Sequence, residues 1–212
     1  MSGALQAVFQ NQRSFSNLPA IGSAYEGGFF AGQISTAGNG IADYNLVIGP
    51  VASAQSTLQF KTANTNDAGA TSSIDGPANS SSMNDASHPA AQFCEGLTIG
   101  GFSDWYLPAR NELEICYFNL KPTTTSNDTG SGTNPNAVPA RASDYTAGTP
   151  AQTSAAAFVT STGAQAFTAD NYYSSTQFSA SVAWIQLFTD GTQQFSSKTN
   201  SLLVRAVRRV AV

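Results

Sequence analysis

The side chains that most often perform enzyme chemistry are few in this sequence. His88 is the only histidine, and neither Cys94 nor Cys116 stands at a zinc-ligand spacing from it. Hydroxyl groups occur at residues 174–176, but no G-x-S-x-G turn presents them as nucleophiles, and His88 is distant in the sequence. We therefore predict that the protein is not an enzyme and that it holds neither a metal nor a cofactor.

A calcium-dependent sugar site has little support either. Calcium takes about six to eight oxygen ligands, several of them from carboxylates. Residues 171–200 contain one acidic residue, Asp190, and its neighbour Gly191 marks it as part of a hairpin turn. We expect no calcium in this region.

Arginines are the remaining candidates for ligand chemistry: Arg110, Arg205, Arg208 and Arg209. One interpretation is an anion site. The other is alternation along a final strand, with Arg205 facing a buried carboxylate such as Glu112 or Glu114. The formal net charge is −4, and the nine Lys and Arg residues form no basic arm or stripe, which argues against binding to nucleic acid.

The overall composition indicates a surface made of hydroxyl and amide groups. Charged residues are 10% of the chain, against roughly a quarter in an ordinary globular protein, while hydrophobic residues are 41%. Such a composition is typical of exported, virion or adhesive proteins rich in β-structure. No apolar run approaches ~20 residues, so we expect no membrane span. The first 15 residues lack the pattern of a secretory signal.

Hydrophobic periodicity and turn residues predict the elements that must position these side chains. Residues 1–20 are polar and cannot build a core, so we expect an arm that attaches the protein to its neighbours. Long irregular stretches are expected at about residues 50–82, with a short strand at 57–60, and at 123–165. Strands are predicted at residues 25–34, 44–48, 172–176, 182–188, 193–196 and 202–210.

Two helices are predicted in the middle of the chain. The first spans residues 83–97, or begins near His88 because Pro89 is awkward inside a helix. The second has Pro108 in its first turn and ends at Lys121. Each apolar face contains one cysteine, so we expect both thiols to stay reduced and to lie near each other if the helices pack together.

The segment that opens the second helix carries a recognisable motif. Trp105, Leu107, Pro108, Glu112 and Leu113 follow the pattern W-x-L-P-x-x-x-E-L, which resembles the signature of the DUF1566 family. The residues themselves also predict that Trp105 and Leu107 share one face and pack in the core.

The C-terminal part supports the same resemblance. Residues 172–176, the pair Ala183-Trp184, the turn Asp190-Gly191, Lys198 and residues 204–210 are similar to the ending of that family, and residues 28–50 are similar to the opening of phage-encoded members. The resemblance implies a C-type-lectin-like α+β fold, with two helices packed on small, mostly antiparallel sheets and long irregular loops. It also implies one domain over residues 21–212.

The resemblance further implies a bacteriophage virion structural protein, displayed on a tail, a fibre or the capsid. Its partners would be other virion proteins through residues 1–20, further copies of itself, and a glycan or protein on the host surface. The alternative is an exported, calcium-independent carbohydrate-binding adhesin. A sulfatase-modifying enzyme would require two cysteines near the C-terminal core, and this chain has none after Cys116.

We expect the recognition surface within residues 172–198, where aromatic rings and amides suit uncharged ligands. The candidate ligand-binding residues are Tyr173, Phe178, Trp184, Gln186, Thr192, Gln193, Gln194 and Phe195. Strand alternation turns about half of them inward, and Trp184 equally fits a place in the core. Residues 192–194 lie next to the turn and are the clearest candidates for exposure.

Overall fold

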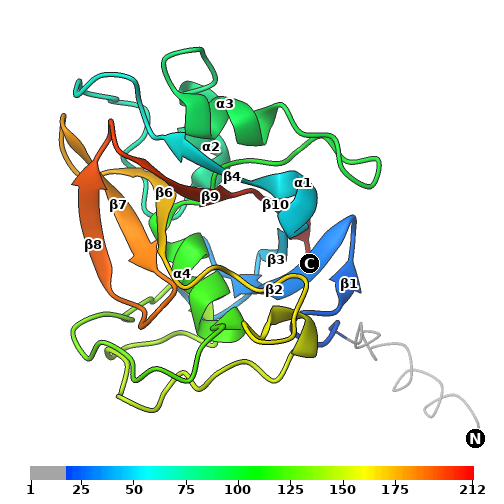
Figure 1. Cartoon of the computed structure of the whole chain (residues 1–212). Coiled ribbons are helices and arrows are strands. Elements are labelled where there is room, and N and C mark those ends of the chain that lie inside the picture. The colour runs from blue at the N-terminus through cyan, green and yellow to red at the C-terminus, as the bar shows by residue number, and fades with distance from the viewer. Residues whose placement is uncertain (1–17) are drawn as a thin grey trace, which may run out of the picture.

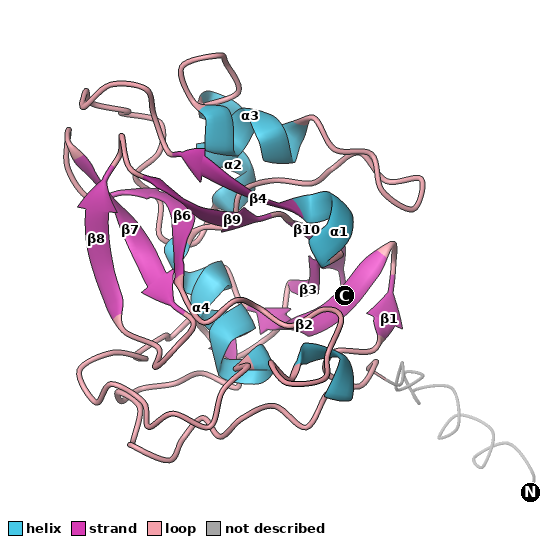
Figure 2. Ribbon diagram, in the orientation of Figure 1, coloured by secondary structure: helices cyan, strands magenta, loops and turns pink. Residues whose placement is uncertain are grey.

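The computed structural model describes residues 18–212, so the predicted arm lies outside the described residues except for its last three. The expected α+β class is confirmed, with short helices among curled and mostly antiparallel sheets (Figures 1 and 2). The elements in chain order are β1 (Ala24–Tyr25), β2 (Gly28–Ile34), β3 (Tyr44–Ile48), α1 (Val51–Ala54), β4 (Gln55–Gln59), α2 (Gly76–Ser82), α3 (Pro89–Glu95), α4 (Arg110–Leu120), β5 (Ala137–Val138), the 3₁₀ helix η1 (Ala156–Phe158), β6 (Asn171–Gln177), β7 (Val182–Leu187), β8 (Gln193–Ser197), β9 (Ser201–Arg205) and β10 (Val207–Ala211).

The strands form two sheets. The first has the order β1-β2-β3-β10, with β5 paired to β2, and the second has the order β4-β9-β6-β7-β8. The predicted hairpin of β2 and β3 is confirmed, and so is the β7–β8 hairpin around Asp190 and Gly191. Every pairing is antiparallel except that of β6 with β9. The longest helix, α4, lies between the sheets in Figure 1.

The last predicted strand is wrong in one respect, because the chain changes sheet within it. Ala206 separates β9 from β10, and its N–H donates to Ala54 O at 2.9 Å while its carbonyl accepts from Gly49 N at 2.9 Å. β9 therefore pairs with β4 and β6 in the second sheet, and β10 pairs with β3 in the first. This crossing holds the two sheets together at the C-terminal end of the chain.

The two helices predicted in the middle of the chain are present as α3 and α4, and two further helices precede them. α3 begins at Pro89, directly after His88, so of the two predicted starting points the one near His88 is confirmed and the one at residue 83 is not. α4 begins after Ala109, so Pro108 precedes the helix, and the Glu112 carboxylate accepts the N–H of Ala109 at 2.8 Å. α1 and α2 lie in the stretch expected to be irregular. Asp75 accepts the N–H of Ala78 at the start of α2, where such a side chain stabilises the first turn.

Two apolar clusters fill the interior. The first contains the apolar face of α4 together with Ala31, Leu46, Tyr172 and Phe188. The second lies under α3 and includes Trp105, Leu107, Tyr173 and Ile185. Trp105 and Leu107 share the second cluster while Tyr106 belongs to the first, which confirms their predicted common face.

Candidate binding surface on strands β7 and β8

Two phenylalanines stand side by side on the outer surface of the second sheet. Within residues 18–212 only five large apolar side chains are exposed, and Phe178 and Phe195 are two of them, at 52% and 51%. Their ring centroids are 4.6 Å apart and their planes differ by 3°. They come from the end of β6 and from β8, an edge strand that is orange in Figure 1. The two exposed rings therefore form one continuous apolar patch.

Trp184 supports this pair from β7. It lies opposite Phe195 in the β7–β8 ladder and meets both rings edge-on, at 5.4 Å from Phe178 and 6.2 Å from Phe195. The tryptophan is partly buried, so it belongs to both the surface and the layer beneath. We call Phe178, Trp184 and Phe195 together the aromatic surface.

Arg110, from the first turn of α4, holds the tryptophan in place. Its guanidinium lies 3.9 Å from the Trp184 ring centroid, and its Nη2 donates to Gln193 Oε1 at 3.1 Å. Burial lowers the pKa of Arg110, and the charge of Glu114 opposes that shift. A cation over an indole ring stabilises the arrangement. The sequence indicated Arg110 only as part of an anion site, because no local pattern shows that α4 packs on β7.

The structure separates the eight candidate residues into three groups. Phe178, Trp184 and Phe195 lie together on the outer face of the second sheet. Tyr173 and Gln186 are buried, so they do not reach the exposed face. The Tyr173 hydroxyl donates to Ser197 O, and Gln186 Nε2 donates to Gly191 O at 2.7 Å.

The remaining three lie on or near the turn between β7 and β8. Thr192 donates through its N–H and its hydroxyl to Asp190 Oδ1, at 3.0 and 2.9 Å, and so stabilises the turn. Gln193 is partly buried beside Arg110. Gln194 is exposed, but it lies opposite Ile185 and therefore on the other face of the strand from Phe195.

The C-terminal arginines are held separately and do not form an anion site. Among residues 18–212 Arg205 has no carboxylate partner, and Glu112 and Glu114 bond elsewhere, so the expected pairing is wrong. Instead its Nε donates to Gly49 O at 2.9 Å and its guanidinium lies 4.6 Å from the Phe167 ring centroid. Burial lowers the pKa of Arg205 to about 10.

The carboxylates expected for Arg205 bond to other arginines. Glu112 accepts from Arg209 Nε at 2.8 Å, and Glu114 pairs with Arg141. Burial raises the pKa of both glutamates, and the arginine charges oppose that shift. Arg208 bonds to Asp104 at 2.6 and 2.9 Å. Each of these arginines therefore serves an internal contact.

The other candidate groups for chemistry are buried in structural contacts. Both cysteines are free, as predicted, but Cys94 lies in the second apolar cluster and Cys116 in the first. Burial raises the pKa of both thiols. His88 lies between Asp67 and Asp85, with its Nε2 and Nδ1 each 2.9 Å from a carboxylate oxygen. Within residues 18–212 no group of three or more His, Cys, Asp or Glu side chains is arranged to hold a metal ion.

The match to a known family covers most of this architecture. Residues 51–208 match the Lcl C-terminal domain family. The chain belongs to the Lcl C-terminal domain family. This family is related to the one that the sequence motifs resemble, and the matched part of the Lcl domain contains α4, β6, β7 and β8. A comparison with curated proteins gives no match. None of the helices in the described part of the chain is long and apolar enough to span a bilayer.

Proposed function

We propose that this protein is a surface-displayed, non-catalytic binding protein that contacts uncharged polar ligands, glycans above all, through the aromatic surface. The observation that carries the proposal is the parallel pair of Phe178 and Phe195, exposed to solvent and supported by Trp184. Aromatic faces pack against the C–H faces of sugars and against apolar parts of proteins without requiring charge.

The exposure of these two rings to water is energetically unfavourable. Apolar area left in water costs roughly 25 cal/mol per Å² relative to burial. The chain nevertheless leaves two of its exposed apolar rings in contact with each other, where a ligand can cover both at once. Contiguous exposed apolar groups on an otherwise polar protein are characteristic of contact sites. Membership of the Lcl C-terminal domain family supports a surface or adhesin-like role.

For the setting, we propose a bacteriophage particle, on which residues 1–20 contact other virion proteins or neighbouring copies. The similarity of residues 28–50 to phage-encoded sequences supports this placement. The alternative is an exported carbohydrate-binding adhesin, since the same surface would serve equally on a cell. Antibody labelling of purified particles and of the cell envelope distinguishes the two, because each proposal expects signal in one of them and not in the other.

Two observations support the absence of catalysis. The thiols of Cys94 and Cys116 are buried in different apolar clusters, so they do not form the reactive pair of a sulfatase-modifying enzyme. The hydroxyls at residues 174–176 are buried, and Ser174 and Thr176 donate to Trp184 O and Ser72 O at 3.0 and 2.8 Å. These groups therefore stabilise β6 and its neighbours.

The proposal is tested by removing the aromatic surface and measuring binding. We expect Phe178→Ser with Phe195→Ser to weaken binding of the labelled protein to neutral oligosaccharide arrays at least tenfold, since central aromatic groups dominate most contact surfaces. The matched control is Ile41→Ser with Val212→Ser, which removes two other exposed apolar side chains at 68% and 67% exposure. Equal binding by the folded Phe178/Phe195 variant and by the control would overturn the proposal.

A further inference from the structure

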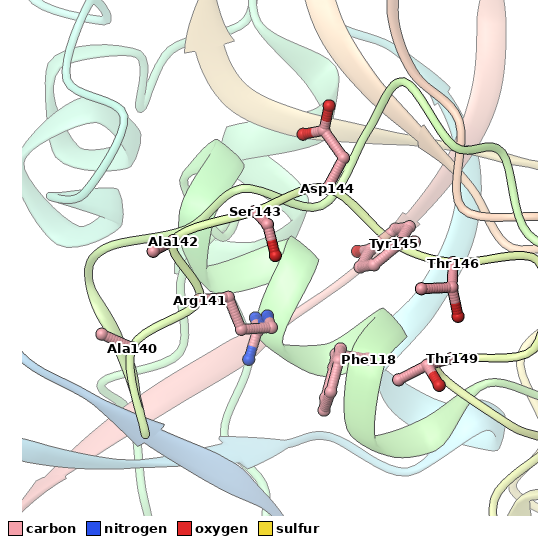
Figure 3. A pocket seen from close by; sticks show the side chains of 9 residues that line it. All are labelled: Phe118, Ala140, Arg141, Ala142, Ser143, Asp144, Tyr145, Thr146 and Thr149. Carbon is pink, nitrogen blue, oxygen red and sulfur yellow. The ribbon is translucent and has the colours of Figure 1, made fainter.

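A pocket of about 330 Å³ lies beside α4, on a part of the molecule distinct from the aromatic surface. Residues 140–146 and Thr149 line it together with Phe118 of α4 (Figure 3). The volume falls at the lower end of the ~300–1,000 Å³ range of small-molecule sites. The lining residues are Phe118, Ala140, Arg141, Ala142, Ser143, Asp144, Tyr145, Thr146 and Thr149.

The walls of the pocket are held in place by one buried carboxylate. Glu114, fully buried on α4, accepts hydrogen bonds from the Tyr145 hydroxyl and from Asn134 Nδ2, both at 2.6 Å, and pairs with Arg141. The Arg141 guanidinium also lies 4.1 Å from the Phe118 ring centroid. The irregular segment is therefore fixed to the helix at this point, and the pocket is a built feature of the fold.

Two charged side chains, Arg141 and Asp144, line the pocket. The positive charge of Arg141 is balanced by Glu114. Asp144 is directed away from Phe118 and Thr149 in Figure 3, and its carboxylate accepts from Thr133 at 2.7 Å. The Asp144 carboxylate therefore keeps its negative charge at the outer edge of the pocket and disfavours anionic ligands, whereas the positive charge beside Phe118, that of Arg141, is paired with Glu114.

The groups left for a ligand are hydroxyls, one guanidinium NH₂ group and apolar faces. The side chains of Ser143, Thr146 and Thr149 make no hydrogen bond to residues 18–212, and Arg141 Nη1 likewise has no partner there. Phe118 and the alanines at 140 and 142 supply apolar contact. Hydroxyls that both donate and accept, set beside an aromatic ring, match an uncharged polyol.

We propose that this pocket binds one neutral hexose residue. The site does not depend on the aromatic surface, although the two are neighbours. Ser131 accepts the N–H of Tyr145 through its carbonyl, at 2.7 Å, and the N–H of Gln193 through its hydroxyl, at 2.9 Å. Ser131 therefore connects the wall of the pocket to the start of β8.

The test is ligand-observed NMR on the full chain with D-glucose, D-galactose and D-mannose, and with D-glucuronate and D-glucosamine as charged probes. We expect at least one neutral hexose to bind, and neither charged sugar to bind more tightly. Thr146→Val with Thr149→Val keeps the side-chain shape and removes two hydroxyls. The affinity for the neutral hexose should therefore fall about threefold to tenfold.

The control is Thr71→Val with Thr162→Val, a matched pair of exposed threonines outside the pocket, which should leave affinity unchanged. Phe178→Ala should leave it unchanged as well, which separates this proposal from that of the aromatic surface. Absence of neutral hexose binding, preference for a charged sugar, or equal affinity in the pocket variant and its control would each overturn the proposal.

Discussion

The aromatic surface and the charged cluster behind it differ in what they contribute to the protein. Phe178 follows Gln177 directly, and Gln177 Oε1 accepts the N–H of Asp67 at 2.7 Å. Asp67 also accepts from Lys198 Nζ at 2.7 Å and from Lys61, and its Oδ1 lies 2.9 Å from His88 Nε2. We call Lys61, Asp67, His88, Gln177 and Lys198 the Asp67 cluster.

The two regions are adjacent but have opposite exposure. All members of the Asp67 cluster are buried, whereas Phe178 and Phe195 are about half exposed. The cluster anchors the irregular segment after β4 to the ends of β6 and β8. Removal of one member of the Asp67 cluster would therefore leave buried charge without a partner, whereas the exposed rings are available for contact.

The largest loss of stability is expected from Asp67→Asn. This variant keeps the shape of the side chain but leaves Lys61 and Lys198 without their carboxylate, and uncompensated buried charge is costly. We expect the free energy of unfolding to fall by about 3 kcal/mol or more in chemical denaturation. Asp144→Asn is the control, because that exposed group has one hydrogen bond and should change stability by about 0.5 kcal/mol or less. Similar losses of unfolding free energy in Asp67→Asn and Asp144→Asn would show that the buried cluster matters no more to stability than an exposed carboxylate.

The contribution of Asp67 to the free energy of unfolding should depend on pH. Burial raises the pKa of Asp67, but hydrogen bonds from Lys198, Lys61 and His88 outweigh it, so the pKa lies below the ordinary value. The stabilisation is therefore complete above the ordinary pKa of about 3.9 and is lost as the pH falls through the lower folded value. We expect the difference between wild type and Asp67→Asn to shrink below about pH 4. A constant difference between pH 7 and pH 2 would contradict this explanation.

A smaller effect is expected at the support of the aromatic surface. Arg110→Met keeps an unbranched side chain but removes the cation over Trp184 and the bond to Gln193. The expected loss is about 1 kcal/mol of unfolding free energy. Arg110→Lys retains the positive charge without the flat guanidinium. Its unfolding free energy should therefore lie between those of the wild type and of Arg110→Met. Full stability of the methionine variant would show that α4 does not support this surface.

The smallest effect on stability is expected within the aromatic surface itself. Phe178→Ala removes a half-exposed ring and one stacking contact, so the unfolding free energy should fall by about 1 kcal/mol or less. Phe158, which is fully buried in the first apolar cluster, provides the contrast. Phe158→Ala should cost about 3 kcal/mol or more. Equal losses at the two positions would show that Phe178 serves the fold as much as binding.

The sequence predicted the elements whose signals are local. The hairpins β2–β3 and β7–β8 have turn residues between alternating strands, and α4 has a clear beginning and end, so all three appear as expected. Trp184 and Phe195 lie opposite one another in the β7–β8 hairpin and share a face, whereas Phe178 joins them from the residue after β6, which no local signal indicated. The helices α1 and α2 were not predicted, because they are short and consist mainly of small or polar residues that define no apolar face.

The sequence alone determined the α+β class, the main hairpins, the central helix and the residue types of the aromatic surface. Only the tertiary structure decided which partners the charged groups have and which residues of the surface face outward. Arg205 bonds to carbonyls while Arg209 and Arg141 take the two glutamates, Ala206 moves the chain between sheets, and Gln186 is buried. These outcomes depend on which distant segments pack side by side, and neither residue type nor local spacing carries that information.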